Sequence, residues 1–462
     1  MVTKISQETF DSVVKENMVE FGMSLEEARE ESVKQFESQG INLGNIIKDL
    51  NVDPVTGTPL LNESVDYLKT KGKPQLDADK GAICKHLDVV IAESELSVPH
   101  RVLAAQLGAY EYVVKTLHEE CDLDKEIQDK LFMAANSIIN SQPDVFDDRS
   151  LEIVTKFLAE KEPKTTCDAL RWFQKACIRH EMNRRLIMNK SRFVNECNIL
   201  LGSDNAEIVK NVCALFRYLI LDDDIRVEFG LAHEHARMLS VHLTDVTQLL
   251  FKFKTNQALI CDILLTIGAL TVRNEYCQVV EEAGGLKFIM DAMVEFPENV
   301  RLLREATKLL KALAGNDSVK LHIIQGGAAP LLESALNRHK DKESFARYAL
   351  LCVATLALRV QENSAALFES GISDTIIQTM KIHPKNQHVQ RNGAWAIRNM
   401  VSRCRDQCDT FISQGAEDVL NQAIADHPKI NQDVRSALRD LGCKVHLNEE
   451  WKGISDIQIS RD

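Results

Sequence analysis

The side chains best suited to chemistry are concentrated in one segment, residues 221–242. It contains three successive carboxylates and two imidazoles, which are Asp222, Asp223, Asp224, His233 and His235. Such groups can bind Zn²⁺, but residues two apart on a helix do not share a face, and no third ligand follows at a standard spacing. We therefore expect no metal and no other cofactor. The remaining interpretations are that the aspartates cap a helix and pair with Arg226 or Arg237, or that the segment is a protein-contact loop.

The motifs that mark common enzyme sites are missing from the sequence. The patterns G-x-x-x-x-G-K-[ST], G-x-G-x-x-G, G-x-S-x-G and H-E-x-x-H do not occur, although they mark phosphate, dinucleotide, hydrolase and zinc sites. We interpret Gly284–Gly285 and Gly326–Gly327 as turn glycines rather than phosphate cradles. The sequence thus predicts a protein that is not an enzyme. An enzyme would need a metal bound at His233 and His235.

Composition narrows the class of protein. The 462 residues are 45% hydrophobic but only 6% aromatic, and the formal net charge is −13. An acidic chain with few aromatic side chains disfavours nucleic acid binding. No apolar run reaches the roughly 18 residues that a membrane span needs, and the N-terminus lacks a signal-peptide core. The 12 cysteines form no C-x-x-C pair, so we interpret them as small buried hydrophobes in a reducing compartment.

The spacing of recurring glycines and polar residues predicts the helices that position these side chains. A glycine precedes an apolar run at intervals of 42, 44 and 44 residues, at Gly285, Gly327, Gly371 and Gly415. A polar residue precedes a short helical run at intervals of 41, 50, 42, 47 and 43 residues, at Asn183, Asp224, Asn274, Asn316, Asn363 and Asp406. A helical unit of this period is typical of HEAT or armadillo solenoids. The interval of 50 residues indicates an insertion within residues 221–242.

The repeated unit, its glycine, and the pair Trp395 and Asn399 on one helix face resemble armadillo repeats over residues 76–445. More narrowly, stretches across nearly the whole chain resemble the armadillo repeat-containing protein 6 family of animals, among them RHEMNR, DDDIRVEFGLAHEHARM, VRNEYCQVVEEAGGL, LKALAGND and ALRDLGC. The resemblance implies an all-α fold, a right-handed superhelical solenoid preceded by an N-terminal helical hairpin. It implies little about mechanism.

We expect four regions along the chain. Residues 1–50 form an acidic helical hairpin with five Lys or Arg against ten Asp or Glu, and the capping box Ser24-x-x-Glu27 opens its second helix. Residues 51–75, which are rich in Pro and Gly, form a linker. Residues 76–445 form a solenoid of about eight units, and residues 446–462 form a C-terminal tail.

In an armadillo solenoid the third helices of successive units line a continuous groove. We place them at Lys164–Arg179, Glu207–Ile220, Gln257–Arg273, Asn299–Leu313, Lys342–Arg359 and His388–Arg403. They carry 17 Lys or Arg against five Asp or Glu, within a chain of net charge −13. This segregation predicts a comparatively basic groove that attracts an acidic peptide. The alternative is that basic residues end these helices because they suit the helix dipole.

The predicted partner contacts belong to these helices, namely Arg171, Trp172, Arg217, Arg304, Lys308, Trp395, Arg398 and Asn399. Trp395 and Asn399 resemble the pair with which armadillo nuclear-import receptors hold a cargo peptide, although Trp395 has the alternative role of packing between units. By the period, the register of Asn399 holds Ala176, Arg217, Ile267, Leu309 and Leu356. Because this ladder is incomplete and arginines repel a basic localisation signal, the sequence argues against an import receptor.

The sequence therefore predicts a non-enzymatic scaffold or adaptor that binds a protein or peptide, with no membrane or nucleic acid among its partners. The alternative is a transport- or chaperone-type receptor for a client, in which the acidic hairpin of residues 1–50 occupies the basic groove and regulates release. We expect a monomer in the cytosol, with the nucleus as a second location.

Overall fold

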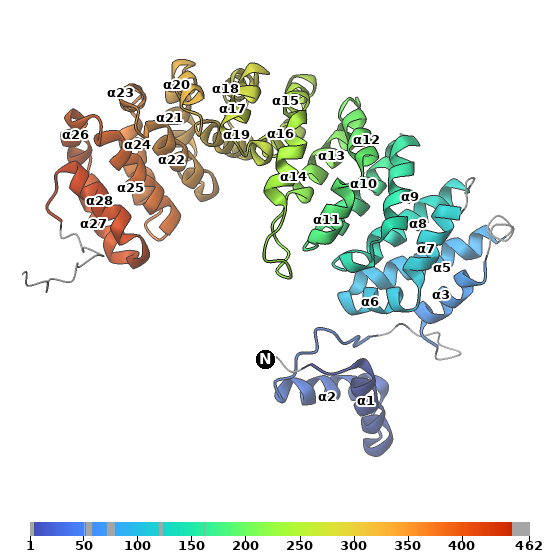
Figure 1. Cartoon of the computed structure of the whole chain (residues 1–462). Coiled ribbons are helices and arrows are strands. Elements are labelled where there is room, and N and C mark those ends of the chain that lie inside the picture. The colour runs from blue at the N-terminus through green and yellow to red at the C-terminus, as the bar shows by residue number, and fades with distance from the viewer. Residues whose placement is uncertain are drawn as a thin grey trace, which may run out of the picture. The chain divides into compact units, whose positions relative to one another are not determined.

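The structure, a computed structural model, describes residues 4–49, 51, 58–71, 79–119, 123–160 and 162–445. These residues fold into α-helices and short 3₁₀ helices (Figure 1), which confirms the predicted all-α class. The chain divides into two compact units, Met1–His235 and Ala236–Asp462. Within the ranges given above, none of the helices has both the length and the apolar composition required to cross a bilayer. The predicted tail, residues 446–462, lies outside these ranges.

The first unit begins with the predicted helical hairpin, α1 (Gln7–Phe21) and α2 (Leu25–Ser38). Ser24 and Glu27 form the expected capping box: Ser24 Oγ accepts from the Glu27 N–H at 3.3 Å, and Glu27 Oε2 accepts from the Ser24 N–H at 2.9 Å. The hairpin and the residues after it share a small hydrophobic core made of Phe10, Val14, Ala28, Phe36, Leu43 and Ile46. The hairpin therefore buries apolar surface of its own.

The predicted linker, residues 51–75, was wrong in its middle. Residues Leu60–Lys69 form helix α3, which buries Leu61, Val65 and Leu68 and packs against helix α5 (Lys80–Leu96). The three apolar side chains follow helical spacing and so make one stripe along α3. The prolines and glycines on either side concealed this stripe, because they were interpreted as breaking the whole segment. Helical packing thus begins before residue 76, where the solenoid was predicted to start.

The rest of the first unit consists of stacked helices. They are α5, α6 (Val98–Gln106), α7 (Ala109–Glu119), α8 (Lys125–Ile138), η1 (Pro143–Val145), α9 (Asp148–Glu160), α10 (Pro163–Cys177), α11 (Glu181–Met188), α12 (Ser191–Leu201) and α13 (Ala206–Leu219). Four of them, α5, α8, α10 and α13, pack in series, each against the next. Helices α10 and α13 coincide with two of the predicted third helices, whereas α5 and α8 extend the same series toward the N-terminus.

The second unit, whose boundary with the first falls within helix α14, repeats a motif of three helices. Its elements are α14 (Ala232–Leu239), η2 (Ser240–His242), α15 (Leu243–Lys252), α16 (Gln257–Leu270), α17 (Asn274–Glu282), α18 (Gly285–Glu295), α19 (Val300–Leu313), α20 (Asp317–Gln325), α21 (Ala328–Arg338), α22 (Glu343–Ala357), α23 (Gln361–Glu369), α24 (Ile372–Ile382), α25 (Gln387–Val401), η3 (Arg405–Gln407), α26 (Cys408–Ser413), α27 (Ala416–Asp426), η4 (Pro428–Ile430) and α28 (Asn431–Leu441). The third helices α16, α19, α22, α25 and α28 pack side by side in this order. All but α28 were predicted.

Glycines make the turn between the first and second helix of a repeat. Gly284, Gly327, Gly371 and Gly415 have φ angles of 85°, 92°, 84° and 94°. This left-handed region is open to glycine and strained for residues with a Cβ atom. The turn interpretation of the glycines is therefore confirmed, with the correction that Gly284 makes the first turn and Gly285 begins helix α18.

Polar side chains join each repeat to the one before it. Asn183 Nδ2 donates to the carbonyls of Pro143 and Ala176 at 2.8 and 2.9 Å. Three histidines near the ends of second helices contact carbonyls 42 or 43 residues earlier: His339 Nε2 with Pro297 at 2.7 Å, His383 with Lys340 at 2.7 Å and His427 with Pro384 at 2.7 Å. The Asn183 bonds are buried, where backbone carbonyls need a hydrogen-bond partner. Together with the histidine contacts, they link neighbouring repeats.

The inserted residues lie on the N-terminal side of a short helix, α14, and not within that helix or after it. Helix α14 begins at Ala232, which is 42 residues before Asn274, the first residue of α17. The interval of 50 residues was counted from Asp224, but Asp224 begins no helix. Residues 221–231 are therefore an additional loop between α13 and α14, which lengthens the interval from the start of α11 at Glu181 to the start of α14 to 51 residues.

Candidate functional site

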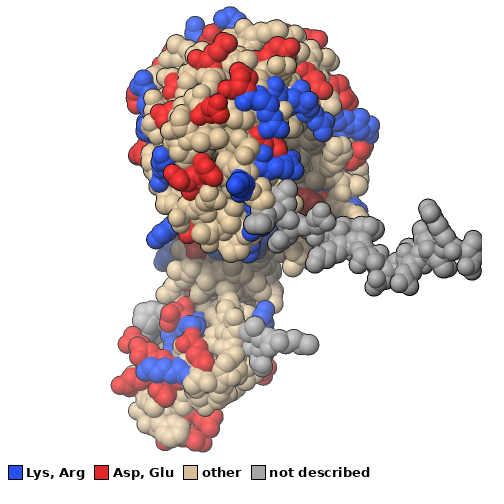
Figure 2. Space-filling view, turned by 90° about the vertical axis from the view of Figure 1, so that its left-hand side faces the viewer, with Lys and Arg blue, Asp and Glu red and all other residues tan. Residues whose placement is uncertain are grey.

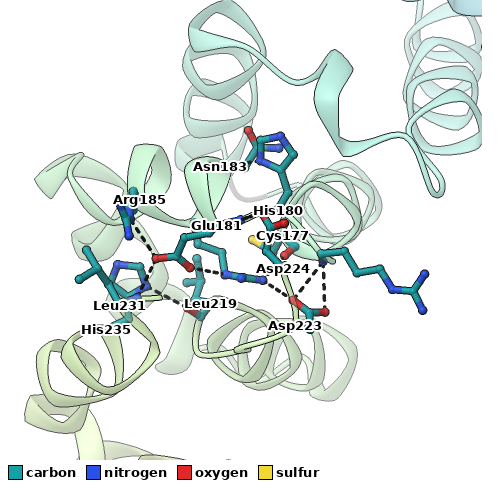
Figure 3. A network of polar contacts seen from close by, with 12 residues as sticks. Cys177, His180, Glu181, Asn183, Arg185, Leu219, Asp223, Asp224, Leu231 and His235 are labelled. Carbon is teal, nitrogen blue, oxygen red and sulfur yellow. Dashed lines mark hydrogen bonds and ion pairs between the residues drawn. The ribbon is translucent and has the colours of Figure 1, made fainter. Parts of the chain in front are cut away.

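Residues 221–231 are held against helix α11 by a network of charges (Figure 3). The Arg184 guanidinium donates through Nε to Glu181 Oε2 at 3.0 Å and through Nη1 to Asp223 Oδ1 at 2.7 Å. The side chains of Glu181 and Arg184 are each only 1% exposed. Burial raises the pKa of Glu181, but hydrogen bonds from the Leu231 N–H and from two arginines outweigh it and hold that pKa below its usual value.

Two of the predicted aspartates bind the start of α11. Asp224 Oδ2 accepts from the Glu181 N–H at 2.9 Å, and both oxygens of Asp223 accept from the Arg179 N–H at 3.1 Å. A hydrogen bond from Arg226 Nε to Asp224 Oδ1 at 2.8 Å is the main reason why the pKa of Asp224 lies well below its usual value. Capping and pairing with Arg226 was one interpretation of the sequence, but the capped helix belongs to the preceding repeat.

We call Glu181, Arg184, Asp223, Asp224 and Arg226 the loop clamp. Its members come from helix α11 and from the inserted loop, which are about 40 residues apart in the sequence. Every charge in it has a partner of opposite sign. The clamp therefore gives the inserted loop a fixed conformation on the surface of the first unit.

The histidines of the insertion do not form a metal site. His235 is buried, with Nδ1 3.1 Å from the Leu219 carbonyl oxygen, and burial lowers its pKa. His233 and Asp222 are exposed. In the described ranges, no group of three or more His, Cys, Asp or Glu side chains could hold a metal ion. Exposed Ile225 and Phe229 suit a contact loop, and that interpretation stays a prediction.

Four arginines occupy matching positions on successive third helices of the second unit. They are Arg304 on α19, Arg347 on α22, Arg391 on α25 and Arg435 on α28, at intervals of 43, 44 and 44 residues. Each is half-buried, and we call them the arginine row. Asn392 Nδ2 donates to the Arg347 carbonyl at 2.7 Å, so the helix register places Arg391 beside Arg347. Viewed from the C-terminal repeats, Lys and Arg gather toward one side (Figure 2).

Arg347 and Arg391 are held by aromatic rings instead of carboxylates. Arg347 Cζ lies 4.5 Å from the ring centroid of Tyr348, and Arg391 Cζ lies 4.9 Å from that of Trp395. Arg347 Nη2 also donates to the Tyr348 hydroxyl at 3.0 Å. No carboxylate in the described ranges forms an ion pair with either arginine, and the Nε atom of each is buried without a hydrogen-bond partner. Stacking thus places both guanidinium groups and leaves donors uncommitted.

Most of the predicted contact residues have partners within the fold. The ion pairs are Arg171 with Asp168 and Glu207 at 3.0 Å, Arg304 and Lys308 with Glu305 at 2.7 and 2.8 Å, and Arg398 with Asp440 at 3.3 Å. Arg217 is half-buried on α13. Three of these carboxylates, Asp168, Glu207 and Glu305, lie on the predicted third helices and were already included in the charge count. Only Asp440 on α28 adds a negative charge from outside the counted segments. A binding role for these residues stays a prediction.

Trp172 is not a surface residue, so its assignment to partner binding was wrong. Its side chain is 0% exposed, its Nε1 donates to the Tyr110 hydroxyl at 3.1 Å, and its ring meets those of Tyr110 and Phe132 at centroid distances of 6.0 Å. A side chain enclosed between repeats cannot contact a partner. Trp395, by contrast, is half-buried beneath Arg391.

Asn399 binds the neighbouring repeat. Its Nδ2 donates to the Ala354 carbonyl at 2.8 Å, so this donor serves helix packing. Counted from the start of each third helix, the positions equivalent to Asn399 on α25 are Thr355 on α22 and Ala312 on α19. The sequence had predicted Leu356 and Leu309 at these positions. The predicted register was displaced because connections between helices differ in length.

Arg347 and Arg391 were not among the contact residues predicted from the sequence. The recurrence of arginine at intervals of 43 and 44 residues was visible and could have revealed the row. The sequence could not show that Arg347 and Arg391 lack a carboxylate partner in the described ranges, since such partners come from neighbouring helices as well as from the same helix, as Glu207 does for Arg171 and Glu305 for Arg304.

Comparison with known proteins places the chain. A family model described as ARMC6 matches residues 61–460, and one described as the Armadillo repeat-containing protein 6 N-terminal domain matches residues 2–72. The chain belongs to the armadillo repeat-containing protein 6 family. The N-terminal match ends after helix α3, which agrees with α3 being ordered structure rather than linker.

Relatives in this family match along their whole length. The chain is 49% identical over 466 residues to the Armadillo repeat-containing protein 6 homolog of Drosophila melanogaster, covering 100% of both chains. It is 30% identical to the human Armadillo repeat-containing protein 6, covering 98% of this chain and 94% of the human one. An engineered protein of known crystal structure matches with a TM-score of 0.68 at 16% identity, over 83% of this chain and 88% of that one, which shows likeness of fold. Membership of an armadillo-repeat family indicates a role in protein interaction.

Proposed function

We propose that this protein is a non-enzymatic scaffold that captures a protein or peptide partner on the surface formed by α19, α22, α25 and α28. The observation that carries the proposal is the arginine row, in which Arg347 and Arg391 are half-buried on aromatic rings without a carboxylate partner in the described ranges. Guanidinium groups bind carboxylates through two parallel hydrogen bonds. A partner with acidic side chains therefore fits this surface.

The test is affinity purification with the full-length protein followed by mass spectrometry. The double variant Arg347→Gln, Arg391→Gln is compared with wild type and with a control, Lys287→Gln, Arg338→Gln. The control removes two charges from the second helices α18 and α21 of the same unit. We expect a defined set of partners to be lost from the row variant and retained by the control, with unchanged circular dichroism. Equal sets from all three proteins would contradict the proposal.

The client-receptor alternative has one observation in its favour. The hairpin is acidic, with ten Asp or Glu against five Lys or Arg in residues 1–50, and it has its own core, so it can compete for a basic surface. Deleting residues 1–49 leaves α3 in place and so keeps Leu61, Val65 and Leu68 on α5. If the hairpin competes, this deletion raises the affinity for acidic peptides. Unchanged affinity would eliminate the regulated-receptor model and leave the scaffold model intact.

A further inference from the structure

We infer that Arg347 and Arg391 read the spacing of acidic side chains in a bound peptide, and that they select a polyproline II segment with a carboxylate at every third residue. This inference rests on the proposed function and names the partner's chemistry. The ligand class is a flexible or proline-containing acidic segment of another protein.

The separation of the two arginines follows from helix packing. Helices α22 and α25 pack against each other, and packed helices have axes about 8–10 Å apart. Two hydrogen bonds, Asn392 Nδ2 to the Arg347 carbonyl at 2.7 Å and Asn399 Nδ2 to the Ala354 carbonyl at 2.8 Å, fix the register between these helices. Because Arg347 and Arg391 hold equivalent positions, their spacing along the row is about one helix separation.

This spacing favours one peptide conformation. A polyproline II helix has three residues per turn and rises about 3.1 Å per residue, so side chains three apart share a face and lie about 9 Å apart. In a β-strand, residues on one face lie two or four apart, at about 7 or 13 Å. Of these two extended conformations, the polyproline II repeat matches the separation of adjacent third helices and the β-strand repeat does not. The PPII segment also suits binding because it is already extended when free.

The environment of the two arginines favours a carboxylate ligand. Each guanidinium is oriented by an aromatic ring, Tyr348 or Trp395, so little side-chain freedom is lost on binding. Lys308 Nζ also lies 5.3 Å from the centroid of the Tyr348 ring, but it is paired with Glu305 at 2.8 Å. Arg304, at the end of the row, is paired with Glu305 as well. The middle of the row is therefore where an acidic ligand gains most.

The test uses fluorescence anisotropy with full-length protein and labelled 12-residue peptides of one composition. Each peptide carries three Glu among Pro and Ala. One peptide spaces them three residues apart, and two others space them two or four residues apart. We expect the first to bind roughly tenfold more tightly, because it engages both arginines through charge-assisted hydrogen bonds. The variant Arg391→Gln should remove this preference, whereas the control Arg338→Gln should keep it.

The outcomes separate this inference from the proposed function. Equal affinity for the three peptides would overturn the inference and show that only diffuse charge attracts them. Tighter binding of a single-stranded RNA of equal charge would overturn it as well. Either result leaves the scaffold proposal standing if the row variant still loses its protein partners. If the row variant keeps those partners, the proposed function fails and this inference fails with it.

Discussion

The loop clamp and the arginine row both consist of charged side chains contributed by neighbouring repeats, yet they differ in burial and pairing. In the clamp, Glu181 and Arg184 are each 1% exposed and form an ion pair at 3.0 Å. In the row, Arg347 and Arg391 are half-buried, stack on aromatic rings and have no carboxylate partner in the described ranges. The first arrangement holds a loop in place, and the second leaves charge available to a ligand.

Solvation explains the difference. Moving an ion out of water costs several kcal/mol, and only a close partner with good hydrogen bonds offsets that cost. Arg184 therefore requires both Glu181 and Asp223. A half-exposed guanidinium keeps part of its hydration and gains from an aromatic face, so the fold does not require a carboxylate beside Arg347 or Arg391. Pairing inside the fold thus distinguishes structural charge from charge that can bind.

The largest expected effect on the free energy of unfolding comes from a pair of tryptophans. Like the two charge clusters, one tryptophan is buried and the other is half-buried. Replacing buried Trp172 with Ala should reduce the free energy of unfolding by about 3–5 kcal/mol, since it opens a large cavity. Replacing half-buried Trp395 with Ala should reduce it by about 1–2 kcal/mol and should weaken acidic-peptide binding. Urea unfolding and peptide anisotropy measure the two effects. A destabilisation of equal size in both variants would contradict the assignment of Trp172 to the core.

The second-largest expected effect comes from a substitution that disrupts the loop clamp. Glu181→Gln should cost about 3 kcal/mol, because it leaves the buried charge of Arg184 undercompensated. Hydrogen exchange should show faster opening of α11 and of residues 221–231. The control Glu152→Gln changes a carboxylate whose side chain is 62% exposed and should stay within about 0.5 kcal/mol of wild type. Equal exchange in both variants would show that the clamp is dispensable.

Acid should open the clamp selectively. Hydrogen bonds hold the pKa values of Glu181 and Asp224 below their usual values. The stability they contribute is therefore complete above about pH 4.3, the value for unfolded Glu, and is lost as the pH falls through the lower folded values. We expect exchange protection of residues 221–231 to decline as the pH falls from about 4.3 to about 2. Asp224→Asn should weaken this pH dependence, and an identical profile in the variant would contradict the role of Asp224.

The smallest expected effect on stability belongs to the arginine row. The variant Arg347→Gln, Arg391→Gln should change the free energy of unfolding by no more than about 1 kcal/mol, because neither arginine forms an ion pair with the residues that the structure describes. Its affinity for acidic peptides should fall, and wild-type binding should weaken as salt increases from about 0.05 to about 0.5 M, because salt screens exposed charges. A loss of stability as large as that of Glu181→Gln would show that the row holds the fold.

Much of the fold follows from local sequence. Glycines at intervals of 42 and 44 residues predicted the turns, because only a residue without Cβ adopts their left-handed backbone easily. Apolar spacing predicted the third helices α10, α13, α16, α19, α22 and α25. Helix α3 was missed because its apolar stripe is short and lies among prolines and glycines. The deciding signals were therefore local side-chain patterns and their recurrence at a nearly constant interval along the chain.

The candidate site depended on contacts between repeats, which the sequence does not specify. Trp172 and Trp395 occupy similar third helices, but only stacking decides that one is enclosed by Tyr110 and Phe132 while the other lies under Arg391. Asp224 reaches the N–H of Glu181, which is 43 residues earlier. The sequence by itself thus determined the repeated unit, the family and the position of the insertion. The tertiary structure decided which charges are neutralised, because ion pairing depends on distances of a few ångström across neighbouring helices.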